Sequence, residues 1–213
     1  MFTENLSEML RAISSGLRTP VIFALLLLAA ATIIMVGTLV AEVFGERIRM
    51  KAKLPPLLDA IKDESKNIEV IIKESGLLKR QRNMLLELNS HPNLNANTRE
   101  ALARRLIYEE QSHYERITKI TDMIAKLGPM LGLLGTLIPL GPGLIALGQG
   151  DTYTLSQSML TAFDTTVAGL AVAAVAFIIS AIRKGWYENY MTASEAIAEA
   201  ILDRNANGEV LVQ

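Results

Sequence analysis

Three long stretches without a charged residue constrain this chain more than any other feature of its sequence. They cover residues 19–41, 127–150 and 165–182, which are 23, 24 and 18 residues long. A helix rises about 1.5 Å per residue, so about 20 residues cross the roughly 30 Å hydrocarbon core of a bilayer. Each stretch therefore predicts a membrane-spanning helix. Asp164 is the only charged residue between Asp151 and Arg183, so the third span is expected to begin earlier, at residue 155.

The charged residues gather between the first two spans. Of the 43 in the chain, 29 fall between Glu42 and Lys126, and the apolar residues among them recur at helical spacing. The predicted fold class is all-α: a multi-pass membrane protein with three transmembrane helices and a helical cytoplasmic extension. The predicted segments are an N-terminal interfacial helix (1–18), the transmembrane helices (19–41, 127–150 and 155–182), a cytoplasmic helical insert (42–126), and a cytoplasmic C-terminal helix and tail (183–213).

The first 18 residues form an amphipathic pattern. One helical face carries the apolar residues Leu6, Met9, Leu10, Ile13 and Leu17. This pattern predicts a short helix lying at the membrane surface. A cleaved secretory signal is the alternative, but the 23-residue apolar run is longer than a signal core and no clear basic segment precedes it.

A coiled-coil-like stripe leads into the second span. Its members are Leu102, Leu106, Glu110, His113, Ile117, Ile120 and Ile124, at alternating steps of four and three. No helix breaker precedes Gly128-Pro129, so one long helix is expected to run from the insert into the membrane. The run from Pro139 to Gly143 is expected to kink this helix or end it early. The C-terminal helix is expected to fade at residues 205–208.

Basic residues near the spans predict the orientation in the cell membrane. Eight of them flank the sides joined to the insert and the C-terminus: Arg47, Arg49, Lys51, Lys53, Lys119, Lys126, Arg183 and Lys184. The connection around residues 149–151 has none. The positive-inside rule therefore places the insert and the C-terminus in the cytoplasm and the N-terminus outside.

Small residues and hydroxyls line the last two spans. The third span carries a stripe of Ala162, Thr166, Gly169, Ala173, Ala176 and Ser180, and the second carries Gly128, Gly132, Gly135 and Thr136. Small residues allow helices to approach closely, so Gly132, Gly135, Ala162, Gly169 and Ala173 are candidate packing residues. The stripe is interpreted as needing a facing helix, which suggests assembly into oligomers. The hydroxyls either bond to their own helices or line a water-filled path.

These residues resemble a known family. Pro129-x-x-Gly132-Leu133-Leu134-Gly135-Thr136 and Thr166-x-x-Gly169-Leu170, with a large loop after a lone first span, are similar to the MotA/TolQ/ExbB proton-channel family. The similarity is closest to the three-span TolQ/ExbB branch. It covers the topology of the whole chain, while the motif similarity is confined to about residues 126–184.

The resemblance implies a homo-oligomeric ring, in the family a pentamer, around a single-span ExbD/TolR-like partner whose membrane aspartate carries the proton. Thr136 and Thr166 match the pore-facing threonines of the family, and Thr165 and Asp164 are further ion-path candidates. The branch has a glutamate five residues before the third-span threonine, where this chain has Thr161. Asp164 lies about 200° round the helix from Thr166, so it either joins the ion path or is hydrated or packed elsewhere.

Other classes of function find little support in the sequence. The formal net charge of −1 gives no case for nucleic-acid binding, and the chain has no cysteine. No nucleophile–base pair, metal-ligand spacing or phosphate-binding loop is present, so neither an enzyme nor a cofactor or metal is expected. The prediction is an ion-conducting subunit of an energy-transducing motor, with the proton as the expected ion. A non-conducting membrane scaffold and a MotA-like torque stator remain the alternatives.

Overall fold

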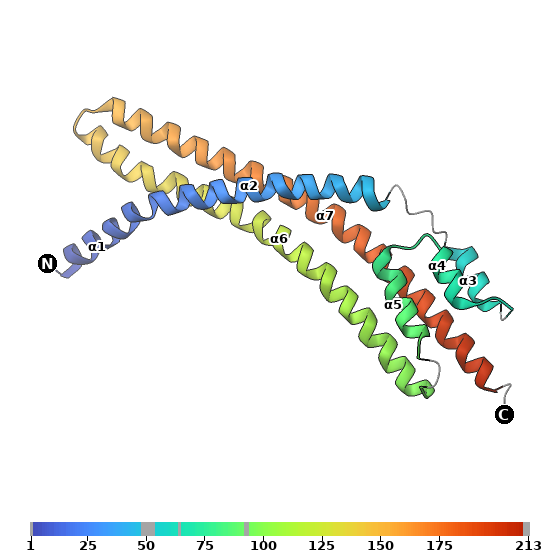
Figure 1. Cartoon of the computed structure of the whole chain (residues 1–213). Helices are drawn as coiled ribbons and strands as arrows, with labels where there is room; N and C mark the ends of the chain where they lie inside the picture. The colour runs from blue at the N-terminus through green and yellow to red at the C-terminus, as the bar shows by residue number, and fades with distance from the viewer. Residues whose placement is uncertain (1, 48–53, 64, 92–93, 211–213) are drawn as a thin grey trace. The chain divides into compact units, whose positions relative to one another are not determined.

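The computed structural model describes residues 2–47, 54–63, 65–91 and 94–210. Within these ranges there is no strand, and the all-α prediction is confirmed. The elements in chain order are α1 (Phe2–Gly16), α2 (Arg18–Glu42), the π-helical turn η1 (Val43–Arg47), α3 (Leu54–Lys62), α4 (Ile68–Glu74), α5 (Lys79–Asn89), α6 (Ala96–Gly148) and α7 (Thr152–Val210) (Figure 1).

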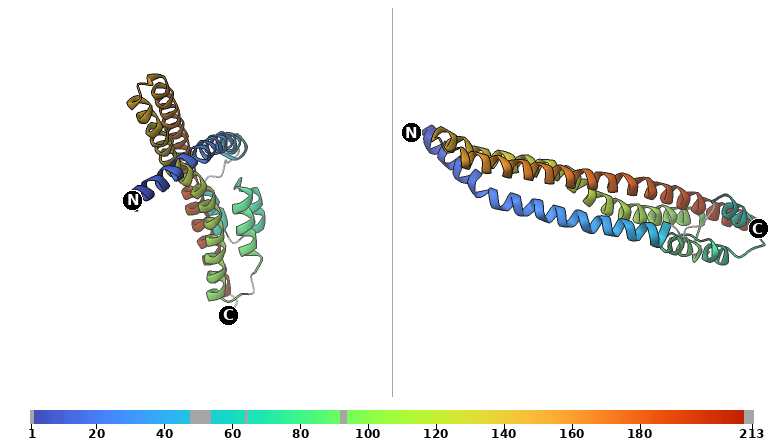
Figure 2. Two further views of the ribbon diagram at one scale, coloured as in Figure 1. Left: turned by 90° about the vertical axis from the view of Figure 1, so that its left-hand side faces the viewer. Right: turned by 90° about the horizontal axis from the view of Figure 1, so that it is seen from above.

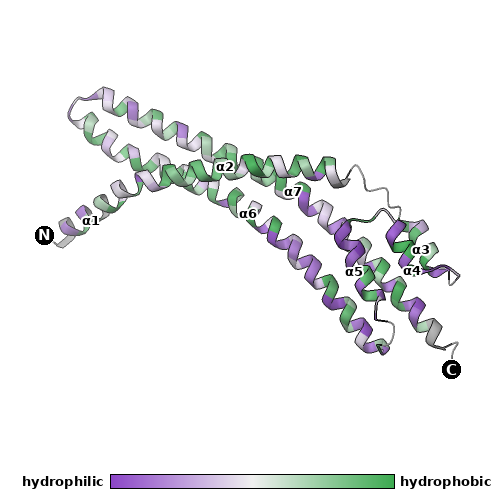
Figure 3. Cartoon of the chain, viewed as in Figure 1, coloured by the Kyte–Doolittle hydropathy of each residue, from purple (hydrophilic) through white to green (hydrophobic). Residues whose placement is uncertain are grey.

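Three helices are long and apolar enough to cross a membrane. They lie at Ala12–Gly45, Ala96–Gly148 and Thr152–Ala206, and their most apolar windows have mean hydropathies of 2.6, 1.9 and 2.3. Apolar residues run the length of α2, whereas α5 and the first part of α6 are largely hydrophilic (Figure 3). The chain is therefore a multi-pass membrane protein.

α6 is one continuous helix of 53 residues, so the prediction of a single helix through Gly128-Pro129 is confirmed. The expected early end near Pro139 is wrong, because the helix contains Pro129, Pro139 and Pro142 and runs to Gly148. A proline removes one backbone donor, and in a membrane helix neighbouring elements compensate for it. The contact with α7 continues beyond the prolines, since a Cβ at Gly143 would lie 3.0 Å from the Cβ of Ser158.

A tight turn joins α6 to α7. Gly150 has φ +78°, a left-handed conformation that suits glycine. The backbone N–H of Asp151 donates to the carbonyl of Ala146 at 2.9 Å, and the Asp151 carboxylate accepts the backbone N–H of Thr154 at 3.0 Å. The turn thus ends one helix and caps the next.

The chain divides into two compact units, which are described separately. The first consists of residues 1–38 and 119–181. Here α6 and α7 run antiparallel beside each other (Figure 2). α2 packs on this hairpin through Leu28, Ala29, Ala31 and Met35.

The second unit consists of residues 39–118 and 182–213. In it α3, α4 and α5 pack on the first part of α6 and the last part of α7 around a core whose most buried members are Ile61, Ile72, Leu85, Leu88, Ile197 and Ile201. The buried Gln81 amide of α5 donates to the Tyr190 carbonyl at 2.9 Å and to Ser194 Oγ at 3.1 Å. The predicted helical insert is therefore a packed bundle.

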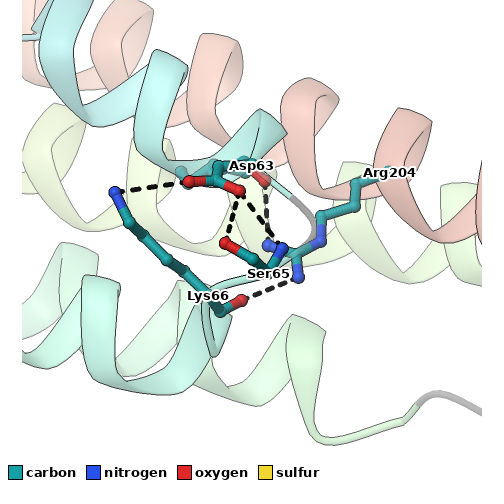
Figure 4. Close-up of polar contacts among 5 residues, drawn as sticks. Asp63, Ser65, Lys66 and Arg204 are labelled. Carbon is teal, nitrogen blue, oxygen red and sulfur yellow. Dashed lines mark hydrogen bonds and ion pairs between the residues drawn. The ribbon is translucent and has the colours of Figure 1, made fainter.

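The loop between α3 and α4 is held by polar contacts (Figure 4). The carboxylate of Asp63 accepts hydrogen bonds from the hydroxyl of Ser65 at 2.6 Å and from its backbone N–H at 3.2 Å. Arg204 of α7 donates to the carbonyls of Ile61 at 2.9 Å and Lys66 at 2.7 Å. The bonds from Ser65, its hydroxyl first and its backbone N–H second, lower the pKa of Asp63.

Two further expectations are wrong, and part of a third lies outside the described residues. Ile120, expected in the buried stripe of α6, is 52% exposed, and Thr121 is buried beside it. α7 continues as a helix to Val210 rather than fading at residues 205–208. Of the basic residues used for the orientation, Arg49, Lys51 and Lys53 lie outside the described residues.

Candidate functional site

Glycines bring the backbones of α6 and α7 into direct contact in the first unit. A Cβ added at Gly169 would lie 2.5 Å from the carbonyl oxygen of Gly128 and 2.9 Å from the Cα of Gly132. A Cβ at Gly135 would lie 2.6 Å from the Cβ of Thr165. Real side chains do not approach so closely, so this helix spacing depends on residues without a side chain.

The stripe of small residues on α7 therefore meets α6 of the same chain. Ala162, Ala173 and Ala176 are buried along it, and a Cβ at Gly128 would lie 3.0 Å from the Cβ of Ala173. The facing helix that this stripe was expected to need is therefore α6 of the same chain, so the stripe gives no argument for assembly between subunits.

Thr136 and Thr166 lie at the margin of this contact. Gly135 and Thr165 face each other, and Thr165 is buried between the helices. One residue further turns a side chain about 100° round its helix, which leaves Thr136 and Thr166 half-buried. A Cβ at Gly132 would lie 3.6 Å from the Cα of Thr166. Thr136 is one helical turn beyond Gly132, so the two threonines lie at a similar level.

α2 packs on the margin of the α6–α7 hairpin that does not carry Thr136 and Thr166. It contacts a cluster formed by Ile124 of α6 with Val172 and Ala176 of α7. Thr136 lies about 120° round α6 from Ile124, and Thr166 lies about 120° round α7 from Val172. The two threonines therefore share the margin of the hairpin that faces away from α2. We call this surface the threonine edge.

The hydroxyls of the threonine edge donate to their own helices. Thr136 Oγ1 donates to the carbonyl of Leu133 at 2.7 Å, and Thr166 Oγ1 donates to that of Ala162 at 3.0 Å. Their hydrogens are used, so each oxygen presents lone pairs. These oxygens can accept hydrogen bonds from water, hydronium or a protonated carboxyl group.

Asp164 does not join the threonine edge. Its side chain is exposed on α7 between the exposed Phe163 and the buried Thr165. At about 200° from Thr166 it faces away from α6. The structure brings Thr136 and Thr166 together and leaves Asp164 on the far side of α7.

Two polar clusters were not singled out from the sequence. In the first unit, the hydroxyl of Ser180 donates to Asp122 Oδ1. In the second, Glu42 at the end of α2 pairs with Arg183 at 3.1 Å and accepts the hydroxyl of Tyr187 at 2.9 Å. The side chains of Arg183 and Glu42 are only 7% and 17% exposed. The charged residues that border the spans could have indicated these clusters, but in the sequence they served only to predict the orientation.

A comparison with known protein families covers the part of the chain that holds these residues. Residues 71–196 match the model of the MotA/TolQ/ExbB proton channel family. The matched segment contains both threonines, the glycine contact and the connecting turn. A search among curated proteins found no match to the chain.

Proposed function

The chain belongs to the MotA/TolQ/ExbB proton channel family, whose model matches more than half of it, and from this premise we propose that it conducts protons as a subunit of a TolQ/ExbB-like motor. In this proposal copies of the chain form a ring, in the family a pentamer, around a single-span partner of the ExbD/TolR kind. Protons pass along the threonine edge, where the membrane aspartate of the partner takes them up and releases them.

One observation carries the proposal: Thr136 and Thr166 lie together on the one margin of the hairpin that α2 leaves open. Their oxygens lie within otherwise apolar helices, where a polar group without a partner is costly. Lone pairs aimed at a shared path suit a proton-carrying carboxylic acid, which needs an acceptor when it is protonated.

The exposed Asp164 supports assembly. A carboxylate facing lipid in mid-membrane costs about 2.5–3.5 kcal/mol on insertion scales. Contact with a neighbouring subunit or a hydrated path would remove that cost. Because the stripe from Ala162 to Ser180 is occupied by α6, we propose that the face of α7 carrying Asp164 lies against another subunit.

The proposed setting is the cytoplasmic membrane, with the insert and the C-terminus inside. α1 is proposed to lie at the outer surface, because Leu6, Met9 and Ile13 are exposed on it, as is Leu17 just after it. One elementary charge crossing 100 mV releases about 2.3 kcal/mol, which the ring would transmit through the partner.

The test is proton flux through the reconstituted complex of chain and partner. Thr136→Val and Thr166→Val keep the shape but remove the oxygen. Leaving a buried donor without its acceptor costs about 1–3 kcal/mol, so flux should fall by about 5- to 150-fold. The corresponding serine variants should retain most of the flux. Thr32→Val is the matched control, because its buried hydroxyl makes the same kind of bond, to Leu28 at 2.8 Å, on α2.

The non-conducting scaffold is the second candidate, because both edge hydroxyls are already bonded to their own helices. On that reading the valine variants would behave like Thr32→Val. Wild-type flux from both variants would refute the role of the threonine edge in conduction. A wild-type complex that forms the ring but carries no proton flux would replace the proposed function by the scaffold.

A further inference from the structure

A second polar level lies on the hairpin beyond the threonines. It consists of Asp122 on α6, which is half-buried, and Ser180 on α7, which is 2% exposed. The Ser180 hydroxyl donates across the helix pair to Asp122 Oδ1. This distinguishes Ser180 from Thr136 and Thr166, whose hydroxyls bond within their own helices. Ser180 therefore orients a carboxylate that belongs to this chain.

Helical periodicity puts this level on the threonine edge. Asp122 precedes Thr136 by 14 residues, and Ser180 follows Thr166 by 14. Fourteen residues turn about 1400°, within about 40° of four complete turns, and advance about 21 Å along the helix. The two polar levels therefore lie on the same margin of the hairpin, toward the end of the spans that joins the cytoplasmic insert in the proposed orientation.

The surface between the two levels is largely apolar, apart from the exposed Lys126 one helical turn from Asp122. It carries Pro129 and Leu133 on α6 and Leu170 and Phe177 on α7, all of them exposed. A proton leaving the threonine level toward this end would meet no other oxygen-bearing side chain among these residues. Asp122 is the first carboxylate of this chain in its way.

We propose that Asp122, oriented by Ser180, is the proton acceptor at the inner end of the ion path. The inference rests on the proposed function and adds to it a residue of this chain that takes up the proton after the threonine level. The carboxylate binds one proton from hydronium, which becomes water, and then gives it to cytoplasmic water.

Other charged groups border this position. Lys119 and Lys126 flank Asp122 on α6 in the same unit. The segment of α2 that packs on the hairpin, residues 28–35, carries no charge.

Asp122→Asn separates proton uptake from packing. Asparagine keeps an oxygen that accepts the Ser180 hydroxyl, but it cannot take up a proton. If the pair only holds the helices together, the variant should conduct like the wild type. If Asp122 transfers protons, flux should fall by about 100-fold, the lower end of what a positioned proton-transferring group contributes. Asp122→Glu should restore part of the flux.

The experiment uses the full chain with its partner in vesicles, an internal pH dye, and melting temperature and ring size as parallel measurements. Asp59→Asn, an exposed carboxylate of α3, is the control and should leave flux unchanged. Low flux in Asp122→Asn with wild-type melting and assembly supports the inference. Wild-type flux overturns it, as does failure of both the Asn and the Glu variant to assemble, which would assign a structural role.

The Thr136→Val variant tells the two proposals apart. If its flux is low while Asp122→Asn conducts normally, the proposed function stands and the inference is refuted. If the wild-type complex carries no proton flux at all, the proposed function fails and the inference falls with it.

Discussion

Replacing Gly169 by alanine should force α6 and α7 apart. The added methyl carbon would lie 2.5 Å from the Gly128 carbonyl oxygen and 2.9 Å from the Gly132 Cα. Both are backbone atoms, so no side chain can rotate out of the way. Ordinary carbon contacts begin near about 3.5 Å, which requires a separation of about 1 Å. Overpacking of this kind costs about 1–3 kcal/mol.

A matched variant isolates that cost. Alanine is a better helix former than glycine by about 1 kcal/mol, and this gain accompanies both Gly169→Ala and Gly141→Ala. Gly141 lies in α6 with no heavy atom within 4 Å of an added Cβ. The free energy of unfolding of Gly169→Ala should therefore lie about 1–3 kcal/mol below that of Gly141→Ala.

The assay is denaturant unfolding of both variants in the same detergent, followed by circular dichroism. Gly128→Ala should behave like Gly169→Ala, because its Cβ would lie 2.7 Å from the Gly169 carbonyl oxygen. The double variant should cost less than the sum, since both changes act on one contact. Equal stabilities of Gly169→Ala and Gly141→Ala would refute the close helix contact.

Three more predictions concern other parts of the chain. In intact cells, Ser65→Cys should be shielded from an impermeant thiol reagent, and Thr152→Cys, at the start of α7, should be labelled. The reverse pattern would invert the topology. Arg183→Met should lower the free energy of unfolding by about 3–5 kcal/mol, because it leaves Glu42 without its ion-pair partner. Adding Glu42→Gln should recover part of this loss. A loss below about 1 kcal/mol would mean that the pair is solvated. Because the folded pKa of Asp63 is lowered, its contribution to stability is present above its ordinary pKa and is lost as the pH falls through the folded value. Ser65→Ala should raise that pKa toward 3.8 in an NMR titration, and an unchanged pKa would contradict the assigned cause.

The prolines of α6 show that a rule based on sequence neighbours alone can misplace the end of a helix. The run from Pro139 to Gly143 predicted a kink or an early helix end, yet α6 continues to Gly148. A local rule counts the donor that each proline removes. It does not count the neighbouring helix, which packs against Gly143 beyond both prolines.

Charge along the chain was enough to determine the class of protein. The lengths of the uncharged runs dictated three spans, and the unbroken pattern into Gly128-Pro129 dictated one long helix, because both depend only on residues that are neighbours in the sequence. The threonine motif could likewise be recognised in the sequence, and the segment that matches the family contains it.

Only the tertiary structure decided which faces meet. Helical periodicity tells which residues share a face but not which surface covers that face. The stripe from Ala162 to Ser180 could have met another subunit, and it meets α6 of its own chain. For the same reason Thr165 is buried while its neighbour Thr166 lies on the threonine edge, and Asp122, rather than Asp164, is the carboxylate on that edge. These assignments depend on contacts between residues tens of positions apart, which no local pattern contains.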